Sequence, residues 1–377
     1  MAETPVVSFA PTEEQELIRS TARQYLEDRV GLARVRELMM SDEGFDAVLW
    51  KEMADMGWLG LIVAEEHGGS GLSPIEMGVL LEEMGRLVTP GPFFASAVLA
   101  TMVIQELATT AQQADLLPPL ATGESIGALA VFESPRRWAP DEPITRGRRD
   151  GESWILSGTK RAVLGGTDAD ALLVTASTDE GVGVFVVDAV TSGLSIEAEP
   201  VLDPTRRQAS LTFDSVRVGA DARLGSGDAT ETLRRVMSIA SLYLAAEQVG
   251  GAQRCLEMSV DYAKTRYQFG RPIGSYQSIK HRCANMLMKV EHAKSAAFYA
   301  ARVTDEPAEL AVAAPMAASV SSESYVWVAG ENIQIHGGIG FTWEHDAHIY
   351  FKRAKASSLL FGDPRYQRDL LGRALGI

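Results

Sequence analysis

The chain has 377 residues, of which 46% are hydrophobic and 23% charged, and its 35 basic and 50 acidic residues leave a net charge of −15. This length predicts two or three domains with ample core. The acidic balance argues against nonspecific nucleic-acid binding and against an anionic membrane surface. We expect no membrane span, because no apolar run is long enough, and no signal peptide, because the N-terminal MAETPVVSFAPTEE is not typical of one.

The two cysteines, Cys255 and Cys283, both lie within helical patterns. They form neither a metal motif nor a disulfide framework, and the six histidines include no His-x-x-x-His pair. We therefore predict no metal site, a reducing cytoplasm as the compartment, and buried packing roles for both thiols.

The first third of the chain is predicted to be helical. Thr12 is suited to an N-cap, and Gln15 three residues later completes a capping box. Helical periodicity continues to about residue 120, with breaks at 67–71 and 90–92. The glycines at 68–71 are interpreted as a structural loop and not a phosphate loop, because no Gly-Lys-Ser/Thr follows them. We predict an N-terminal all-helical domain over 1–122.

Short strand-like runs replace the helical pattern near residue 123. They lie at 126–132, 154–156, 171–175, 183–187 and 210–213, and Gly, Asp and Pro clusters separate them. These runs predict a compact middle β domain over 123–222. Helical patterns return at 231–265, 276–304, 307–334, 344–356 and 364–374, with the dimensions of a bundle over 223–377. The predicted fold class is therefore multi-domain α+β.

One stretch, YAKTRYQFGRPIG at Tyr262–Gly274, joins two of these predicted helices. The pattern places Arg266 in the last turn of the first helix, with Phe269 beside it at i+3. The planar guanidinium of Arg266 suits a phosphate partner. An arginine at a helix end can also do no more than complement the helix dipole, and spacing alone favours that second interpretation.

Few other segments indicate chemistry. QIHGGIG at Gln334–Gly340 would let the backbone approach a ligand closely, but a glycine C-cap is the commoner explanation. We interpret Glu344–His348 as a solvated helix start and not as a ligand set. The chain has no Gly-x-Ser-x-Gly elbow, and no Gly-x-Gly-x-x-Gly follows a predicted strand.

Five segments together resemble the acyl-CoA dehydrogenase family over nearly the whole chain, and the last two are the most specific. They are TEEQELIRSTARQYLED at 12–28, GWLGLIVAEEHGGSGL at 57–72, WILSGTKRAVLGGTDADALLV at 154–174, AAEQVGGAQRCLEMSVDYAKTRYQFGRPIGSYQSIKHRCANM at 245–286 and IQIHGGIGFTWEHDAHIYFKRAK at 333–355.

The resemblance implies a fold and a reaction. The fold has an N-terminal helical domain, a middle β-barrel-like domain and a C-terminal four-helix bundle. The reaction is FAD-dependent α,β-dehydrogenation of an acyl-CoA thioester, in which a carboxylate takes the α-proton and the flavin N5 takes the β-hydride. The resemblance also implies a dimer or tetramer, with an electron-transfer flavoprotein as the electron acceptor.

The positions that match the family's catalytic base do not carry one. The family's Glu-Gly-Thr segment is matched by Phe361-Gly362-Asp363, and a phenyl ring cannot accept a proton. Some members place the base on an earlier helix, at a position matched by Ala240. Glu247 is the nearest carboxylate, but seven residues along a helix is about 10 Å. A structural role for Glu247 is therefore favoured over catalysis.

Two segments that face the flavin ring in the family are also replaced. Phe132–Trp138 stands for the family's Thr-Glu-Pro-Gly-x-Gly-Ser, and Ala162–Leu164 stands for its Trp-Ile-Thr. In contrast, the family residues that reach across a subunit interface to the neighbour's FAD pyrophosphate and adenosine are retained. They are Arg266, Gln268, Phe269, Gln334, Gly337 and Gly338.

This division leads to a hypothesis about function. The chain resembles the non-catalytic subunit of heteromeric actinobacterial-type members, which would share FAD across an interface with a homologous catalytic subunit. Two alternatives remain: an active homo-oligomer with Glu247 as an atypical base, and a non-redox binding or scaffold homologue. Related two-subunit enzymes act on bulky thioesters such as sterol side chains, but nothing in this sequence selects that substrate.

Overall fold

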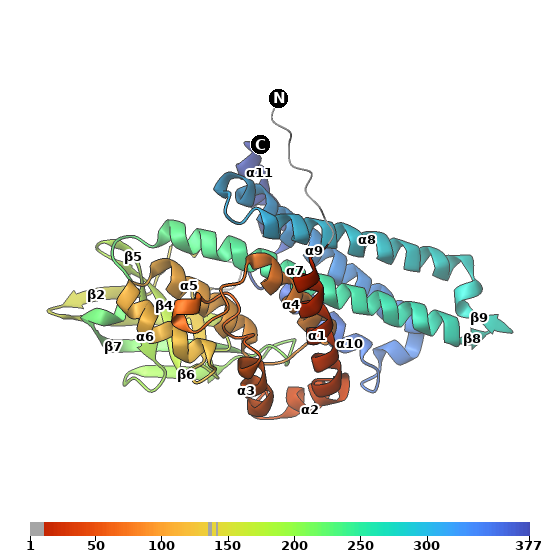
Figure 1. Cartoon of the computed structure of the whole chain (residues 1–377), viewed down its shortest axis with the longest axis horizontal. Coiled ribbons are helices and arrows are strands. Elements are labelled where there is room, and N and C mark those ends of the chain that lie inside the picture. The colour runs from red at the N-terminus through yellow and green to blue at the C-terminus, as the bar shows by residue number, and fades with distance from the viewer. Residues whose placement is uncertain (1–10, 135–137, 141) are drawn as a thin grey trace.

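The computed structural model describes residues 11–134, 138–140 and 142–377 (Figure 1). The molecule is elongated: a β-sheet lies at one end, the tip of a long helical bundle at the other, and the N-terminal helices between them. This arrangement confirms the predicted fold class, with a helical N-terminal part, a curled sheet in the middle and a C-terminal helical bundle.

The N-terminal helices begin at well-formed caps. The side chain of Thr12 accepts a hydrogen bond from the Gln15 backbone N–H and the Gln15 side chain accepts one from the Thr12 backbone, which confirms the predicted capping box. The helices are α1 (Glu13–Arg29), α2 (Leu32–Met40), α3 (Ala47–Asp55), α4 (Pro74–Arg86), α5 (Thr101–Leu107) and α6 (Thr110–Ala121), with the 3₁₀ turn η1 (Glu65–His67) before α4 and the π-helical segment η2 (Phe94–Ala100) before α5.

Among the described residues, the middle sheet has seven strands in the order β1-β4-β2-β3-β7-β6, with β5 beside β4. Strand β1 pairs with β4 in parallel, whereas β3 runs antiparallel to both β2 and β7. The strands are β1 (Gly127–Ala130), β2 (Arg146–Asp150), β3 (Ser153–Leu164), β4 (Ala171–Thr178), β5 (Gly181–Asp188), β6 (Leu194–Ala198) and β7 (Gln208–Gly219).

Strands β2 and β6 are absent from the sequence prediction. Strand β2 reads RGRRD and buries only its glycine, while β6 reads LSIEA and buries no residue fully. Strand β2 therefore lacks the alternation of apolar and polar residues by which a half-buried strand is recognised, whereas β6 does alternate and its five-residue run was missed. Strand β2 is held in place by its pairing with β3, and β6 by its pairing with β7.

All five predicted C-terminal helices are present. They are α7 (Thr230–Thr265), α8 (Gln277–Arg302), α9 (Pro307–His336), α10 (Ala347–Ser357) and α11 (Pro364–Leu375). A hairpin of β8 (Tyr267–Gln268) and β9 (Arg271–Pro272) joins α7 to α8 at the tip of the bundle (Figure 1). In the described part of the chain, no helix is both long and apolar enough to cross a membrane.

Two glycines bring α4 and α7 into backbone contact. A Cβ atom on Gly250 of α7 would collide with the carbonyl oxygen of Glu82 on α4, and one on Gly85 of α4 would collide with the carbonyl oxygen of Glu247 on α7. Only residues without a side chain allow two helices to pack this closely. The contact fixes the N-terminal helices on the bundle and sets the position of Glu247.

Gly250→Ala should lower the free energy of unfolding by about 1–3 kcal/mol, because the added methyl group forces α4 and α7 apart. Gly330→Ala is the matched control, since Gly330 lies inside α9 and its Cβ would be 3.9 Å from Phe351, an ordinary contact distance. Alanine at 330 should keep or slightly raise stability. Urea unfolding, monitored by circular dichroism, gives the free energy of unfolding of both variants. Equal values for Gly250→Ala and Gly330→Ala would contradict the packing account.

Candidate functional site

Residues from three of the segments that depart from the family pattern meet in one small cavity between the sheet and the helices. We call it the Phe361 cavity. It holds about 10 Å³, which is room for about one water molecule. Of the described residues that line it, none has a side-chain nitrogen or oxygen. They are Leu99, Leu129, Val131, Phe132, Ala162, Leu164, Met237, Leu360 and Phe361.

Phe361 fills the position matched to the family's base. Its ring is buried and stacks on the ring of Phe94 from η2, with ring centres 5.7 Å apart and an interplanar angle of 27°. The side chain of Gln367 donates a hydrogen bond of 2.8 Å to the Phe361 carbonyl oxygen, which fixes the backbone. Ala240, at the alternative base position, is fully buried on α7. Neither side chain can accept a proton.

Strand β3 brings Ala162 to the same cavity through a bulge. The pairing of β3 with β7 is irregular between Lys160 and Val163, and Ala162 has a φ angle of 52°. A left-handed backbone is uncommon for a residue other than glycine and costs on the order of 1–3 kcal/mol. The surrounding sheet therefore holds Ala162 where it presents only a methyl group.

The segment after β1 is hydrogen-bonded to the loop that carries Phe361. The indole N–H of Trp138 donates to the Leu359 carbonyl oxygen at 3.1 Å, and the Tyr366 hydroxyl donates to the Trp138 carbonyl oxygen at 3.0 Å. The loop after β1 is thereby tied to the loop between α10 and α11, which carries Phe361. Pro135, Arg136 and Arg137 of the predicted segment lie outside the described residues.

Glu133, the one carboxylate in that segment, binds groups of the sheet. Its carboxylate lies 2.7 Å from the buried ammonium of Lys160 and accepts a hydrogen bond of 2.8 Å from the Thr145 backbone N–H. Burial alone would raise the pKa of Glu133, but Lys160 and the hydrogen bonds from Thr145 together outweigh it and hold the pKa of this carboxyl below its usual value. Glu133 is therefore paired within the sheet and is not among the residues that line the Phe361 cavity.

Glu247 lies in a buried ionic network. One carboxylate oxygen is 2.7 Å from Nη1 of Arg353, and the other pairs with Arg206. Burial alone would raise the pKa of Glu247, but the two guanidinium groups outweigh it and hold that pKa below its usual value. Arg353 also pairs with Asp203 at 2.7 Å. A carboxylate held by two arginines is a poor general base, which favours the structural role.

Sequence reasoning missed Arg353, Arg206 and Asp203. The partners in this network are 41, 106 and 150 residues apart along the chain. No local spacing could pair them, and a buried arginine looks like a surface arginine in a single sequence. Only the packing of α7, α10 and the β6–β7 loop brings them together.

The hairpin at the bundle tip corrects the prediction for Arg266. Helix α7 ends at Thr265, and Arg266 is extended, with φ −81° and ψ 120°. Gln268 pairs with Arg271 across a two-residue loop in which Phe269 and Gly270 have φ angles of 53° and 80°. Such a loop makes a tight hairpin turn and ends the helix. Phe269 is therefore 92% exposed at the tip and is not an i+3 neighbour within a helix.

The end of α9 lies at the same end of the bundle. The rings of Tyr262 on α7 and His336 on α9 stack with centres 4.3 Å apart. Gly337, with φ 64°, ends α9 as the predicted glycine cap. Apart from their own chain neighbours, no described residue has an atom within 4 Å of where a Cβ on Gly337 or Gly338 would be. All six predicted FAD-contact residues are exposed, at the end of the molecule away from the sheet (Figure 1).

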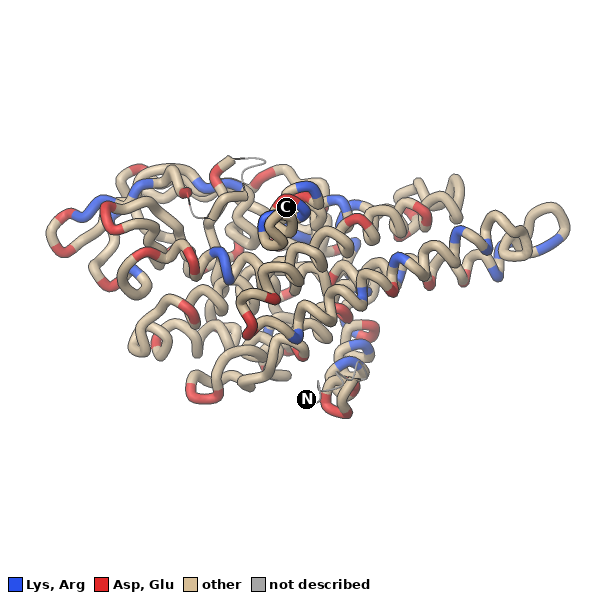
Figure 2. Tube along the Cα trace, turned by 90° about the horizontal axis from the view of Figure 1, so that it is seen from above, with Lys and Arg blue, Asp and Glu red and all other residues tan. Residues whose placement is uncertain are grey.

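The two regions differ in how they suit FAD. The Phe361 cavity does not fit a flavin ring, because it is filled by side chains and its described lining offers no hydrogen-bonding side chain. The bundle tip carries exposed donors, Arg266 and Gln268, and the end of α9 carries open glycine backbone, groups that suit a phosphate or nucleotide approaching from outside. Figure 2 shows basic residues at this tip of a chain that is acidic overall.

The remaining candidates have structural surroundings. The Ala347 backbone N–H donates to Nδ1 of His345 at 3.1 Å, so the 344–348 segment starts a helix, as predicted. Among the described residues, no group of three His, Cys, Asp or Glu could hold a metal ion. Cys255 is buried, as predicted, but Cys283 is only partly buried, because it faces a groove between α7 and α8.

Comparison with known proteins identifies the family. The "Acyl-CoA dehydrogenase, N-terminal domain" matches residues 12–124, and the "Acyl-CoA dehydrogenase, C-terminal domain" matches residues 231–376. Acyl-CoA dehydrogenase IpdE2 of Mycobacterium tuberculosis is 34% identical over 363 residues, which cover 95% of this chain and 96% of that protein. The chain belongs to the acyl-CoA dehydrogenase family.

Solved acyl-CoA dehydrogenases share the whole fold. Butyryl-CoA dehydrogenase of Megasphaera elsdenii has a TM-score of 0.90 at 26% identity, covering 98% of this chain and 100% of that one. The ChsE4–ChsE5 complex of Mycobacterium tuberculosis gives 0.90 at 28% identity, covering 98% and 99%. A Tcur3481–Tcur3483 steroid acyl-CoA dehydrogenase variant gives 0.88 at 33% identity, covering 97% and 98%. Members of the family are FAD-binding oxidoreductases of fatty acid and lipid β-oxidation.

Glu247→Gln should lower the free energy of unfolding by about 3–5 kcal/mol, because it leaves two buried arginines without their carboxylate. Glu231→Gln, an exposed member of an i,i+3 pair on the same helix, is the control and should leave stability nearly unchanged. Denaturant unfolding at neutral pH measures the free energy of unfolding of both variants. A Glu247→Gln protein as stable as wild type would contradict the network.

The same network predicts a pH dependence. The folded-state pKa of Glu247 is lowered, so the stability it contributes is present above the unfolded pKa of about 4.3 and is lost as pH falls through the folded value. The stability difference between wild type and Glu247→Gln should therefore shrink on acidification. A difference that grows as pH falls would contradict this sign.

Proposed function

We propose that this chain is the non-catalytic subunit of a heteromeric acyl-CoA dehydrogenase. A homologous partner supplies the glutamate base and the flavin-ring pocket, and this chain closes the partner's site with its bundle tip. FAD held in such a complex supplies the acceptor for the β-hydride of the acyl-CoA thioester. The residues of this chain bind and orient the outer part of the cofactor, and none of them moves a proton.

The Phe361 cavity carries the proposal. Pockets for cofactors and drug-sized ligands typically enclose about 300–1,000 Å³, whereas this cavity holds about 10 Å³. Opening it would require Phe361 to leave Phe94, and would break the ties from Trp138 to Leu359 and from Tyr366 to Trp138. The position matched to the base, the strand segment at Ala162 and the residue Phe132 all contribute to the same closed wall.

The bundle tip supports the complementary half of the proposal. Arg266, Gln268 and Phe269 lie at a hairpin where all three are exposed in the described part of the chain. Gly337 and Gly338 leave backbone open to an approaching group. These residues therefore suit a phosphate and adenosine that belong to a cofactor seated in another chain.

The relatives support a two-chain assembly and indicate a substrate class. Two of the similar structures carry two protein names each, and one is described as a steroid acyl-CoA dehydrogenase. We propose a bulky CoA thioester, such as a steroid-derived one, as the substrate of the complex. An electron-transfer flavoprotein is the proposed acceptor, and the cytoplasm the proposed compartment.

Co-expression with an acyl-CoA dehydrogenase chain that keeps Glu-Gly-Thr should give a complex with one FAD per pair of chains, counted from flavin absorbance and protein concentration. Arg266→Ala should reduce the flavin retained by that complex while leaving the folding of this chain unchanged, because its side chain is exposed. Arg148→Ala, an exposed arginine on β2, is the control and should retain full flavin.

The flavin count also separates the alternatives. Turnover by this chain alone, with one FAD per chain, would contradict the proposal and favour an active homo-oligomeric acyl-CoA dehydrogenase. If Glu247 served as the base there, anaerobic acyl-CoA would bleach the flavin of the chain and Glu247→Gln would abolish the bleaching. A preparation that stays colourless with each such partner would favour the non-redox scaffold.

Phe361→Glu should not make this chain active, because the rest of the cavity still excludes a flavin ring. The variant should instead lose stability by several kcal/mol, since it places an unpaired carboxyl among apolar side chains. Visible absorbance of the purified variant, with FAD added, tests this. A yellow Phe361→Glu protein that is bleached by acyl-CoA would contradict the closed-cavity account.

A further inference from the structure

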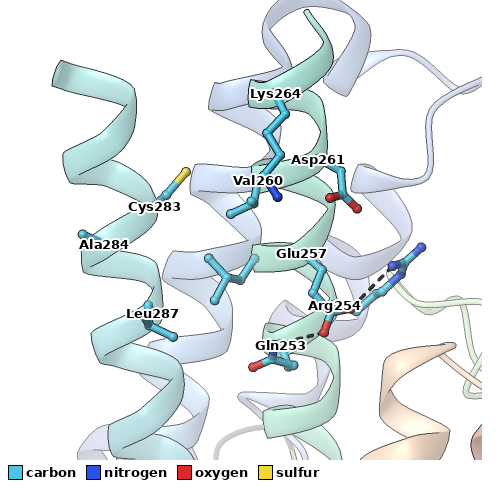
Figure 3. Close-up of a pocket in the computed structure, with 10 residues that line it drawn as sticks. Gln253, Arg254, Glu257, Val260, Asp261, Lys264, Cys283, Ala284 and Leu287 are labelled. Carbon is cyan, nitrogen blue, oxygen red and sulfur yellow. Dashed lines mark hydrogen bonds and ion pairs between the residues drawn. The ribbon is translucent and has the colours of Figure 1, made fainter. Parts of the chain in front are cut away.

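A groove runs between α7 and α8 on the outer side of the bundle. It encloses about 590 Å³, and its lining is mainly apolar. Figure 3 shows Cys283 and Leu287 of α8 pointing toward α7, while Arg254 and Asp261 extend from the side of α7 away from α8. The lining residues are Gln253, Arg254, Leu256, Glu257, Val260, Asp261 and Lys264 from α7, and Cys283, Ala284 and Leu287 from α8.

Helix α8 carries more apolar surface here than its own bundle uses. Its inward face buries Met286 and Val290 in the core. Ala284, Leu287 and Met288 lie on the outward face at i, i+3 and i+4, and Leu287 and Met288 remain 47% and 57% exposed. A helix with apolar residues on both faces is expected to be covered on both. A contiguous exposed apolar patch of this kind marks an interaction surface.

The shape and charge of the groove suit a helix of another protein. Two neighbouring helices leave a trough into which the ridge of a third helix packs. The rim mixes both signs of charge, with Arg254 and Lys264 beside Glu257 and Asp261. Such a rim fits a protein helix with mixed surface charges, whereas an anionic membrane or nucleic acid would meet the carboxylates of a chain with net charge −15.

The groove lies next to the hairpin that we propose contacts the partner's FAD, which indicates the partner that it binds. Its α7 wall reaches Lys264, two residues before Arg266, and the two helices that form it are joined by the hairpin that carries Arg266, Gln268 and Phe269. A chain seated along the groove is therefore placed beside the tip that we propose contacts the partner's FAD. We infer that the α7–α8 groove docks a helix of the homologous catalytic subunit, an inference that rests on the proposed function.

The reactivity of the Cys283 thiol can report whether the groove is covered. It has two cysteines, of which Cys255 is fully buried and Cys283 lines the groove. A maleimide should modify Cys283 in the free chain and leave Cys255 largely unmodified, because an accessible thiol reacts faster than one buried in apolar surroundings. Cys283→Ser identifies the signal. In the complex, modification of Cys283 should slow by about tenfold or more, because the docked helix covers it.

Leu287→Arg in the co-expressed pair tests the inference directly. The variant should fold with an unchanged thermal midpoint, since Leu287 is half exposed, yet it should weaken the complex in size-exclusion chromatography and restore Cys283 reactivity. Val190→Arg is the control, because Val190 is 89% exposed on the turn after β5, at the other end of the molecule. It should change neither readout.

The outcomes separate this inference from the proposed function. A flavin-loaded complex in which Cys283 stays reactive and Leu287→Arg has no effect would overturn the groove as the docking site and leave the proposed function standing. Protection of Cys283 in the chain purified alone, with a homodimer that Leu287→Arg dissociates, would show a second copy of this chain as the occupant and overturn the inference. Absence of any complex would overturn both.

Discussion

The structure depends on a buried ionic network centred on Arg353. From α10, its guanidinium reaches Glu247 on α7 and Asp203 in the β6–β7 loop, and it donates to the carbonyl oxygen of Thr89 at 3.1 Å. One side chain therefore ties the bundle, the sheet and the N-terminal helices together. Burial alone would lower the pKa of Arg353, but Asp203 and Glu247 raise it above the usual arginine value, so the guanidinium stays charged. Buried charges persist only when they are paired in this way.

This network is also joined to the closed cavity. Arg206, which shares Glu247 with Arg353, lies over the ring of Phe94, with its guanidinium carbon 5.5 Å from the ring centre. The other stacking partner of Phe94 is Phe361. The Phe94–Phe361 pair is thus packed against the ionic network that joins the domains. Most residues that line the cavity therefore belong to the hydrophobic core of the molecule.

The sequence predicted the fold well wherever the pattern is local. The capping box at Thr12 and the five C-terminal helices follow from caps and periodicity, while β2 has no apolar alternation and could not be predicted. The short alternation of β6 was present in the sequence but was missed. Family comparison marked Phe361, Ala162 and Phe132 as departures, but only packing shows that they line one cavity. The partners of Glu247 and the hairpin at Phe269 likewise depend on contacts and backbone angles that no spacing rule reveals.

The proposed division of labour places the flavin ring in one chain and a contact to its outer phosphates in another. The visible absorption spectrum of this chain, purified alone and then mixed with excess FAD and desalted, tests that division most directly. The account predicts a colourless protein that retains no flavin, because the Phe361 cavity is filled and the bundle tip alone is an open surface. A yellow protein with one FAD per chain would contradict it.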